Sequence, residues 1–170
     1  MPTHQIIFLI LSFTAYGYAA VRGGAPERIA AAAMFSAVIA TWTLSYLGPR
    51  GPGAYASVEV GVALTDFTLF GIMVTVAMLS ARFWPMLMAS ILGCGLFGHL
   101  TKPLGPDILP KAYYATVALW SYPTLLLLVI ATWRHSSRLK RYGIDYPWVH
   151  TLPRRYRDGW SVNELARPLA

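Results

Sequence analysis

Residues 58–80 read VEVGVALTDFTLFGIMVTVAMLS, an apolar run in which Asp66 is the one formal charge placed well inside. The run is as long as the roughly 20 residues that an α-helix needs to cross the hydrocarbon core of a bilayer. A charge at such a depth is costly, and in membrane helices it usually has a partner or a function. The segment therefore predicts a transmembrane helix and marks Asp66 as a candidate functional residue.

Four further apolar runs of comparable length accompany this one, and connections rich in Gly and Pro separate most of them. The expected spans are Gln5–Val21, Ile29–Leu47, Val58–Ser80, Trp84–Leu100 and Ala112–Trp133. With 56% hydrophobic and 12% charged residues, the 170-residue chain has the composition of a membrane bundle rather than of a soluble domain. The predicted fold class is all-α, with a five-span transmembrane bundle over 1–133 and a basic tail over 134–170.

The Lys and Arg residues predict the orientation of the bundle. Of the 14 in the chain, only Arg50, Lys102 and Lys111 fall on one side of the predicted spans, and the others fall on the opposite side. Cytoplasmic loops carry the excess of positive residues in membrane proteins. We therefore expect the N-terminus outside and the basic C-terminal tail in the cytoplasm, as in a multi-pass protein of a bacterial inner membrane.

Two features predict how the spans pack. Ser90, Cys94 and Gly98 recur every fourth position in the fourth span, and Ala89 and Gly93 form a second small pair beside them; such small faces let helices approach closely. The contact could lie within the bundle or between copies of the chain. In the fifth span, Pro123 lacks an N–H and would strand the carbonyl of Leu119, which predicts a kink near mid-membrane.

A polar cluster is expected on the outer side of the third and fourth spans. Glu59 lies seven residues before Asp66 and hence on nearly the same helix face. The short connection Arg82-Phe83-Trp84-Pro85 predicts an antiparallel hairpin, which brings His99 to the same side. Acid and imidazole together could form part of a proton relay, or a hydrogen bond that only holds the helices together.

Signatures of catalysis and of metal binding are weak. The single cysteine, Cys94, excludes an intrachain disulfide and a Cys-rich metal site. The histidines and acids show no His-x-x-x-His or Glu-x-x-His spacing, and no Gly-x-Ser-x-Gly motif occurs. We therefore expect neither a metal nor a cofactor, and the sequence leans away from an enzyme without excluding one.

The basic tail suits the anionic inner leaflet of a membrane, since each Lys or Arg close to that surface contributes about 1 kcal/mol of attraction. The residues expected to bind lipid or a partner are Arg134, Arg138, Lys140, Arg141, Arg154, Arg155 and Arg157. The helix of the fifth span should continue through Arg141 and stop at Gly143. Other membrane subunits or a second copy of the chain are the expected protein partners, whereas nucleic acid is a less favoured one.

Several short motifs resemble those of small inner-membrane proteins of alphaproteobacterial type, whose function is uncharacterised. They are Arg82-Phe83-Trp84-Pro85, His99-Leu100-Thr101-Lys102, Trp120-Ser121-Tyr122-Pro123 and Arg134-His135. The resemblance covers about the C-terminal two thirds of the chain. It implies an inner-membrane location and transfers no catalytic residue.

Three functions follow from these observations. The first is a small accessory or interaction protein, in which the bundle serves as a scaffold or subunit of a membrane complex. The second is a proton-linked transporter or channel component centred on Asp66, with Glu59 and His99 assisting. The third is a membrane redox or haem subunit, for which only His99 would lie within a span.

Overall fold

The computed structural model describes residues 3–47, 60–104 and 119–152. Over these ranges the chain is α-helical apart from turns and one short 3₁₀ helix, and no β-strand occurs in them. The elements are α1 (Thr3–Arg22), α2 (Ala25–Leu47), α3 (Val60–Leu79), α4 (Trp84–Leu104), α6 (Ser121–Tyr142) and η1 (Val149–Thr151). The predicted all-α class is thus confirmed for the described part of the chain.

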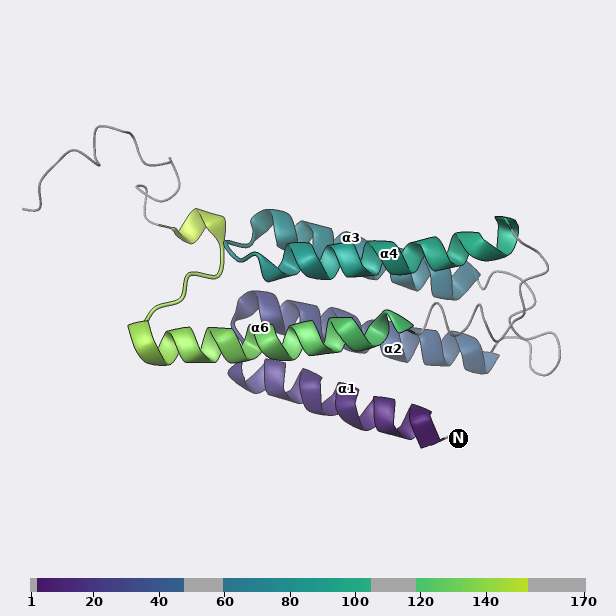
Figure 1. Ribbon diagram of the computed structural model, residues 1–170, viewed down its shortest axis with the longest axis horizontal. Helices are drawn as coiled ribbons and strands as arrows, with labels where there is room; N and C mark the ends of the chain where they lie inside the picture. Colours follow the sequence, from purple (N-terminus) through teal and green to yellow (C-terminus); the bar gives the residue numbers. More distant parts are fainter. Residues whose placement is uncertain (1–2, 48–59, 105–118, 153–170) are drawn as a thin grey trace, which may run out of the picture.

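The helices run alongside one another as a bundle (Figure 1). α1 packs against α2 and α6, and α3 packs against α2 and α4, while α4 and α2 also contact α6. α3 and α4 form the antiparallel hairpin that the short Arg82–Pro85 connection predicts. One end of the bundle gathers the end of α1, the start of α2, the α3–α4 turn and the end of α6. We call this the basic end (residues 22–28, 80–84 and 134–145).

Many large apolar side chains point outward along the helices, and the interior combines large side chains such as Met73 and Leu128 with several alanines. Ala19 and Ala30 are completely buried where α1 and α2 meet. By contrast, Ile10, Phe67 and Leu126 are all more than half exposed. Soluble monomers rarely show so much contiguous exposed apolar surface, because its contact with water is unfavourable.

One helix in the described ranges, α3 at Val60–Leu79, is long and apolar enough to cross a membrane. The apolar part of α1, Ile6–Arg22, is shorter than a typical helix that crosses a membrane. The predicted five-span bundle is therefore not confirmed as such. The described α6 ends in a strongly basic stretch, which makes this helix less apolar than α3.

Within the described chain, the close contact of α4 uses the predicted Ala89 and Gly93 pair, and a contact of the Ser90, Cys94 and Gly98 face with a second copy stays a prediction. Ser90 and Cys94 are exposed and only Gly98 of that set is buried. The neighbouring face makes the close approach to α3, because a Cβ on Gly93 would lie 3.3 Å from Cε2 of Phe70. Ala89, one turn before Gly93, is buried. Each residue turns a helix by about 100°, so a shift of one position selects a different face.

The kink predicted at Pro123 stays a prediction: Leu119 is helical, Trp120 forms a turn, and a further helix follows. α6 begins at Ser121, so Pro123 lies in its first turn, where a missing N–H costs no bond within the helix. The hydroxyl of Thr124 donates to the Ser121 carbonyl oxygen at 2.8 Å. The start of the expected fifth span, at Ala112, lies outside the described residues.

The predicted end of the last helix is confirmed. Gly143 adopts the left-handed conformation with φ of 71°, and its N–H bonds to the Leu139 carbonyl oxygen. Glycine favours this conformation because it lacks a Cβ.

Candidate functional site

The basic end encloses four titratable side chains that come from separate segments. Glu27 lies in the first turn of α2, Arg82 in the α3–α4 turn, His135 in α6, and Asp145 just after α6. All four side chains are buried or nearly so. We call them the buried-charge cluster. Charges removed from water in this way are unfavourable unless they are paired.

Arg82 is the centre of the cluster. Its Nη1 donates to both carboxylate oxygens of Glu27, and its Nη2 donates to Oδ2 of Asp145 at 2.9 Å. The backbone N–H of Arg82 donates to the Ser80 hydroxyl at 3.1 Å, which orders the turn around it. One guanidinium thereby joins α2 to the segment that follows α6, and the planar group suits paired carboxylates.

Glu27 has two further donors. The indole Nε1 of Trp84 donates to its Oε1 at 2.9 Å, and the backbone N–H of Gly24 donates to its Oε2 at 3.1 Å. Gly24 has no side chain, and a Cβ there would lie 3.1 Å from both Glu27 Oε2 and His135 Cε1. A carboxylate in the first turn of a helix is also stabilised by the helix dipole. Glu27 is thus held from three sides.

Asp145 bridges Arg82 and His135. Its Oδ2 lies 2.6 Å from Nδ1 of His135 as well as 2.9 Å from Nη2 of Arg82. A guanidinium can only donate and a carboxylate accepts, so the consistent assignment has Nδ1–H donating to Asp145. The 3.0 Å approach of Arg82 Nη2 to the same ring nitrogen is then a close contact around the shared oxygen.

The chain beyond α6 folds back over the basic end. Pro147 offers its carbonyl oxygen to the backbone N–H of Ala81 and to the Ser80 hydroxyl, each at 3.2 Å. Ser80 and Trp148 form an isolated antiparallel bridge, and Trp148 packs against the core. This stretch, residues 143–152, is called the docked segment. The first part of the predicted tail is therefore attached to the bundle.

The second polar feature is the pair that the sequence predicts on α3 and α4. Asp66 Oδ2 lies 2.9 Å from His99 Nε2, with the Asp66 side chain 31% exposed and the His99 side chain 5% exposed. The hydroxyls of Thr65 and Thr68 donate to carbonyl oxygens of their own helix. Glu59, the third expected member, lies outside the described residues. The structure thus brings together two of the three predicted side chains.

The predicted basic residues divide into three groups. Arg134, Lys140 and Arg141 are exposed on the last turns of α6. Arg138 is partly exposed, with Nη1 3.7 Å from Oδ1 of Asp145. The remaining ones lie outside the described residues: Arg154, Arg155 and Arg157.

Sequence reasoning missed the buried-charge cluster. A weak signal was present, since Glu27 and Asp145 are acids on the side that carries most of the positive residues. In the sequence analysis, Arg82 served only as one of the positive residues that predict the orientation of the bundle. In the described ranges, no three His, Cys, Asp or Glu side chains gather as metal ligands would.

Comparison with protein-family models, with curated proteins and with solved structures finds no match to this chain.

Proposed function

We propose that this chain is a small multispanning protein of a bacterial inner membrane, of alphaproteobacterial type, that acts as a non-catalytic accessory or interaction subunit. In this proposal the helices span the bilayer with the N-terminus outside and the basic end in the cytoplasm. The observation that carries it is the division of the surface. Exposed apolar side chains cover the length of the helices, whereas the exposed cations gather at one end among the helix residues whose side chains the structure describes; Lys102, near the end of α4, is not among them.

A membrane location explains both the apolar surface along the helices and the exposed cations at the basic end. Helices satisfy their own backbone hydrogen bonds, so apolar side chains can face lipid without cost. Arg22, Arg28, Arg134 and Arg141 are exposed at the basic end, where they would meet the anionic headgroups of the inner leaflet. Trp133, exposed directly before Arg134 on α6, suits the boundary between headgroups and hydrocarbon.

The accessory role is supported by the way the basic end is built. The buried-charge cluster connects α2, the α3–α4 turn, α6 and the docked segment through one arginine. Such a network favours a fixed arrangement of helices over a site that opens and closes. A fixed cytoplasmic end suits the presentation of a surface to a partner.

Membrane integration and orientation can be tested together. Alkaline carbonate washing of membranes from a bacterial host should leave the full chain in the pellet. A fluorescent protein fused after Ala170 should fluoresce, and alkaline phosphatase fused at the same place should be inactive. Release by carbonate, or an active phosphatase, would overturn the proposed location or orientation.

The accessory role needs its own test. Proteins that co-purify with the full chain in mild detergent should be compared with those that co-purify with a chain ending at Leu152, which keeps the docked segment, and with one ending at Tyr142. A partner retained by the first truncation and lost by the second would assign docking to residues 143–152. Absence of any stoichiometric partner would count against a subunit role.

The Asp66–His99 pair favours a second candidate, a proton-linked transporter or channel component. A half-buried carboxylate that bonds an imidazole inside a helix pair is a reasonable site for proton transfer. In proteoliposomes with an enclosed pH dye, Asp66→Asn should abolish proton flux, whereas Thr68→Val, an exposed change on the same helix, should preserve it. If wild-type vesicles show no flux above that of empty vesicles, the relay is rejected.

A further inference from the structure

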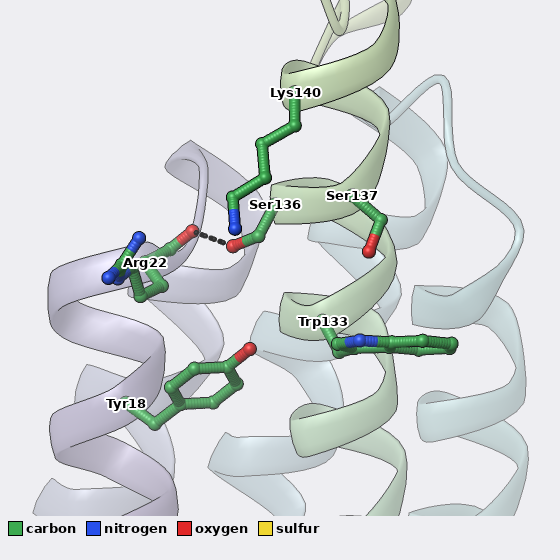
Figure 2. A pocket seen from close by; sticks show the side chains of 6 residues that line it. All are labelled: Tyr18, Arg22, Trp133, Ser136, Ser137 and Lys140. Atoms are coloured by element: carbon green, nitrogen blue, oxygen red, sulfur yellow. Dashed lines mark hydrogen bonds between the residues drawn. The ribbon is translucent and has the colours of Figure 1, made fainter.

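A small pocket lies between α1 and α6 at the basic end, apart from the buried-charge cluster (Figure 2). Its volume is about 240 Å³, below the roughly 300–1,000 Å³ of pockets that hold drug-sized ligands. It is lined by Tyr18, Arg22, Trp133, Ser136, Ser137 and Lys140. The α1 residues are four apart and the α6 residues are spaced by three, four and seven, so each set occupies one helix face.

The lining is cationic and rich in hydroxyl groups. Arg22 and Lys140 are exposed and form no ion pair with any side chain in the described ranges. The nearby carboxylates of Glu27 and Asp145 are held by Arg82. Figure 2 shows the Tyr18 hydroxyl pointing towards α6 and the Lys140 amine reaching back towards Ser136. The amine of Lys140 beside hydroxyl donors favours an anion with several oxygens, such as phosphate, and the exposed Arg22, whose guanidinium points away from α6 in Figure 2, lies at the rim.

The pocket is also fixed in shape. The Ser136 hydroxyl donates to the main-chain oxygen of Arg22 at 3.0 Å and so links the last turn of α1 to α6 (Figure 2). Because that hydrogen is already used, Ser137 and Tyr18 are the hydroxyls left to donate to a ligand. The ligand site thus exists without a rearrangement of either helix.

Apolar side chains continue from the pocket along both helices. Leu11 lies seven residues before Tyr18 on α1, while Ile130 and Leu126 lie three and seven residues before Trp133 on α6. All three are exposed. A free phosphate ion would leave these three apolar side chains uncovered, whereas acyl chains attached to a phosphate would cover them. The joint arrangement of cations and apolar stripe therefore selects a lipid.

We propose that the α1–α6 pocket binds the headgroup phosphate of an anionic glycerophospholipid. Arg22 and Lys140 pair with the phosphate, the hydroxyls of Ser137 and Tyr18 donate to its oxygens, and an acyl chain lies along Leu11, Ile130 and Leu126. The inference rests on the proposed membrane location and adds a defined lipid site to it. Basic pockets between helices on the cytoplasmic side are suited to such headgroups.

Native mass spectrometry of the full chain in detergent, with dioleoylphosphatidylglycerol added, would test the site. Each cation near an anionic headgroup contributes about fivefold in affinity, so Arg22→Gln with Lys140→Gln should weaken binding about thirtyfold. The matched control is Arg28→Gln with Arg141→Gln, which removes two exposed cations that do not line the pocket. Because Arg28 and Arg141 contact the surrounding headgroups but not the pocket, the control should lose clearly less binding of the added lipid than the pocket variant does. Helical content and thermal unfolding of every variant show whether it is folded.

Several outcomes would overturn the lipid site. Equal losses in the two double variants would mean that the lipid responds only to total charge. Equal binding of dioleoylphosphatidylcholine would remove the need for an anionic headgroup. Millimolar inorganic phosphate that displaces the lipid completely would identify free phosphate as the ligand. As a second variant, Ser137→Leu should fill the pocket and reduce binding without a change in charge; unchanged binding would place the lipid elsewhere. Carbonate extraction of the wild type separates this failure from failure of the proposed location.

Discussion

Two acid–base sites in the described part of the bundle differ in how they are built. The Asp66–His99 pair joins two neighbouring helices by one contact of 2.9 Å. The buried-charge cluster at the basic end joins four separate segments through Arg82, and both oxygens of Glu27 and Oδ2 of Asp145 are engaged. The pair is partly open to its surroundings, whereas the cluster is closed. We therefore expect the buried-charge cluster to contribute more to the unfolding free energy than the Asp66–His99 pair. The pair, which is partly exposed, is the better candidate for proton transfer.

The largest effect should come from removal of the central cation. Arg82→Gln leaves Glu27 and Asp145 buried without their common partner, and loss of one member of a buried ion pair costs about 3–5 kcal/mol. Reversible unfolding of the full chain in mixed micelles, with increasing dodecyl sulfate, would measure the loss. Arg28→Gln is the matched control, since Arg28 is an exposed cation on α2. If the two variants unfold alike, the cluster does not hold the fold.

A smaller and more local effect should follow from Asp145→Ala. The change removes the acceptor shared by Arg82 and His135, and an unsatisfied buried donor costs about 1–3 kcal/mol. Hydrogen exchange of residues 143–152 should accelerate by more than tenfold, while exchange within α3 stays slow. Ile144→Ala, a change at an exposed neighbour, controls for truncation in the same segment. Unchanged exchange in the Asp145 variant would show that Pro147 and Trp148 suffice for docking.

These two sites also mark how far the sequence could predict the structure. Asp66 was found because a charge in an apolar run is conspicuous, and His99 followed from the antiparallel hairpin. Arg82 was visible too, but a cation at a helix end serves orientation in most membrane proteins, so its buried role gave no separate signal. The contact between Arg82 and Asp145 depends on a chain reversal after Gly143. No periodic pattern in the sequence predicts the direction of that reversal.

Helix bounds and faces show the same limit. The predicted starts and ends of the spans agree with α1, α3 and α4 to within a few residues, because apolar runs and Pro or Gly mark them directly. The sequence pattern indicates both the Ser90–Cys94–Gly98 face and the Ala89–Gly93 pair as small surfaces. In the structure, Gly93 of the second pair lies against the ring of Phe70 on α3, a contact between helices that the spacing alone does not predict.

The Asp66–His99 pair should contribute less to stability than the buried-charge cluster. In a double-mutant cycle of Asp66→Asn and His99→Gln, the coupling free energy should be about 1 kcal/mol, as is typical of hydrogen bonds between membrane helices. The same unfolding assay in mixed micelles measures it. A coupling as large as the loss in Arg82→Gln would contradict the contrast drawn between the two sites. Unchanged folding with altered proton flux would instead favour the relay.

The smallest effect is expected at the rim of the cluster. Arg138 is 42% exposed on its side chain, and its Nη1 lies 3.7 Å from Asp145 Oδ1, beyond a good hydrogen bond. Its Nε is buried and has no partner among the described residues, so removing the side chain also removes an unsatisfied donor. Arg138→Gln should therefore lower the unfolding free energy by less than about 0.5 kcal/mol. The same measurement at about 0.5 M salt should erase even that difference, because screening acts within a few ångströms there. A salt-resistant loss of several kcal/mol would instead place Arg138 inside the cluster and make Asp145, rather than Arg82, its centre.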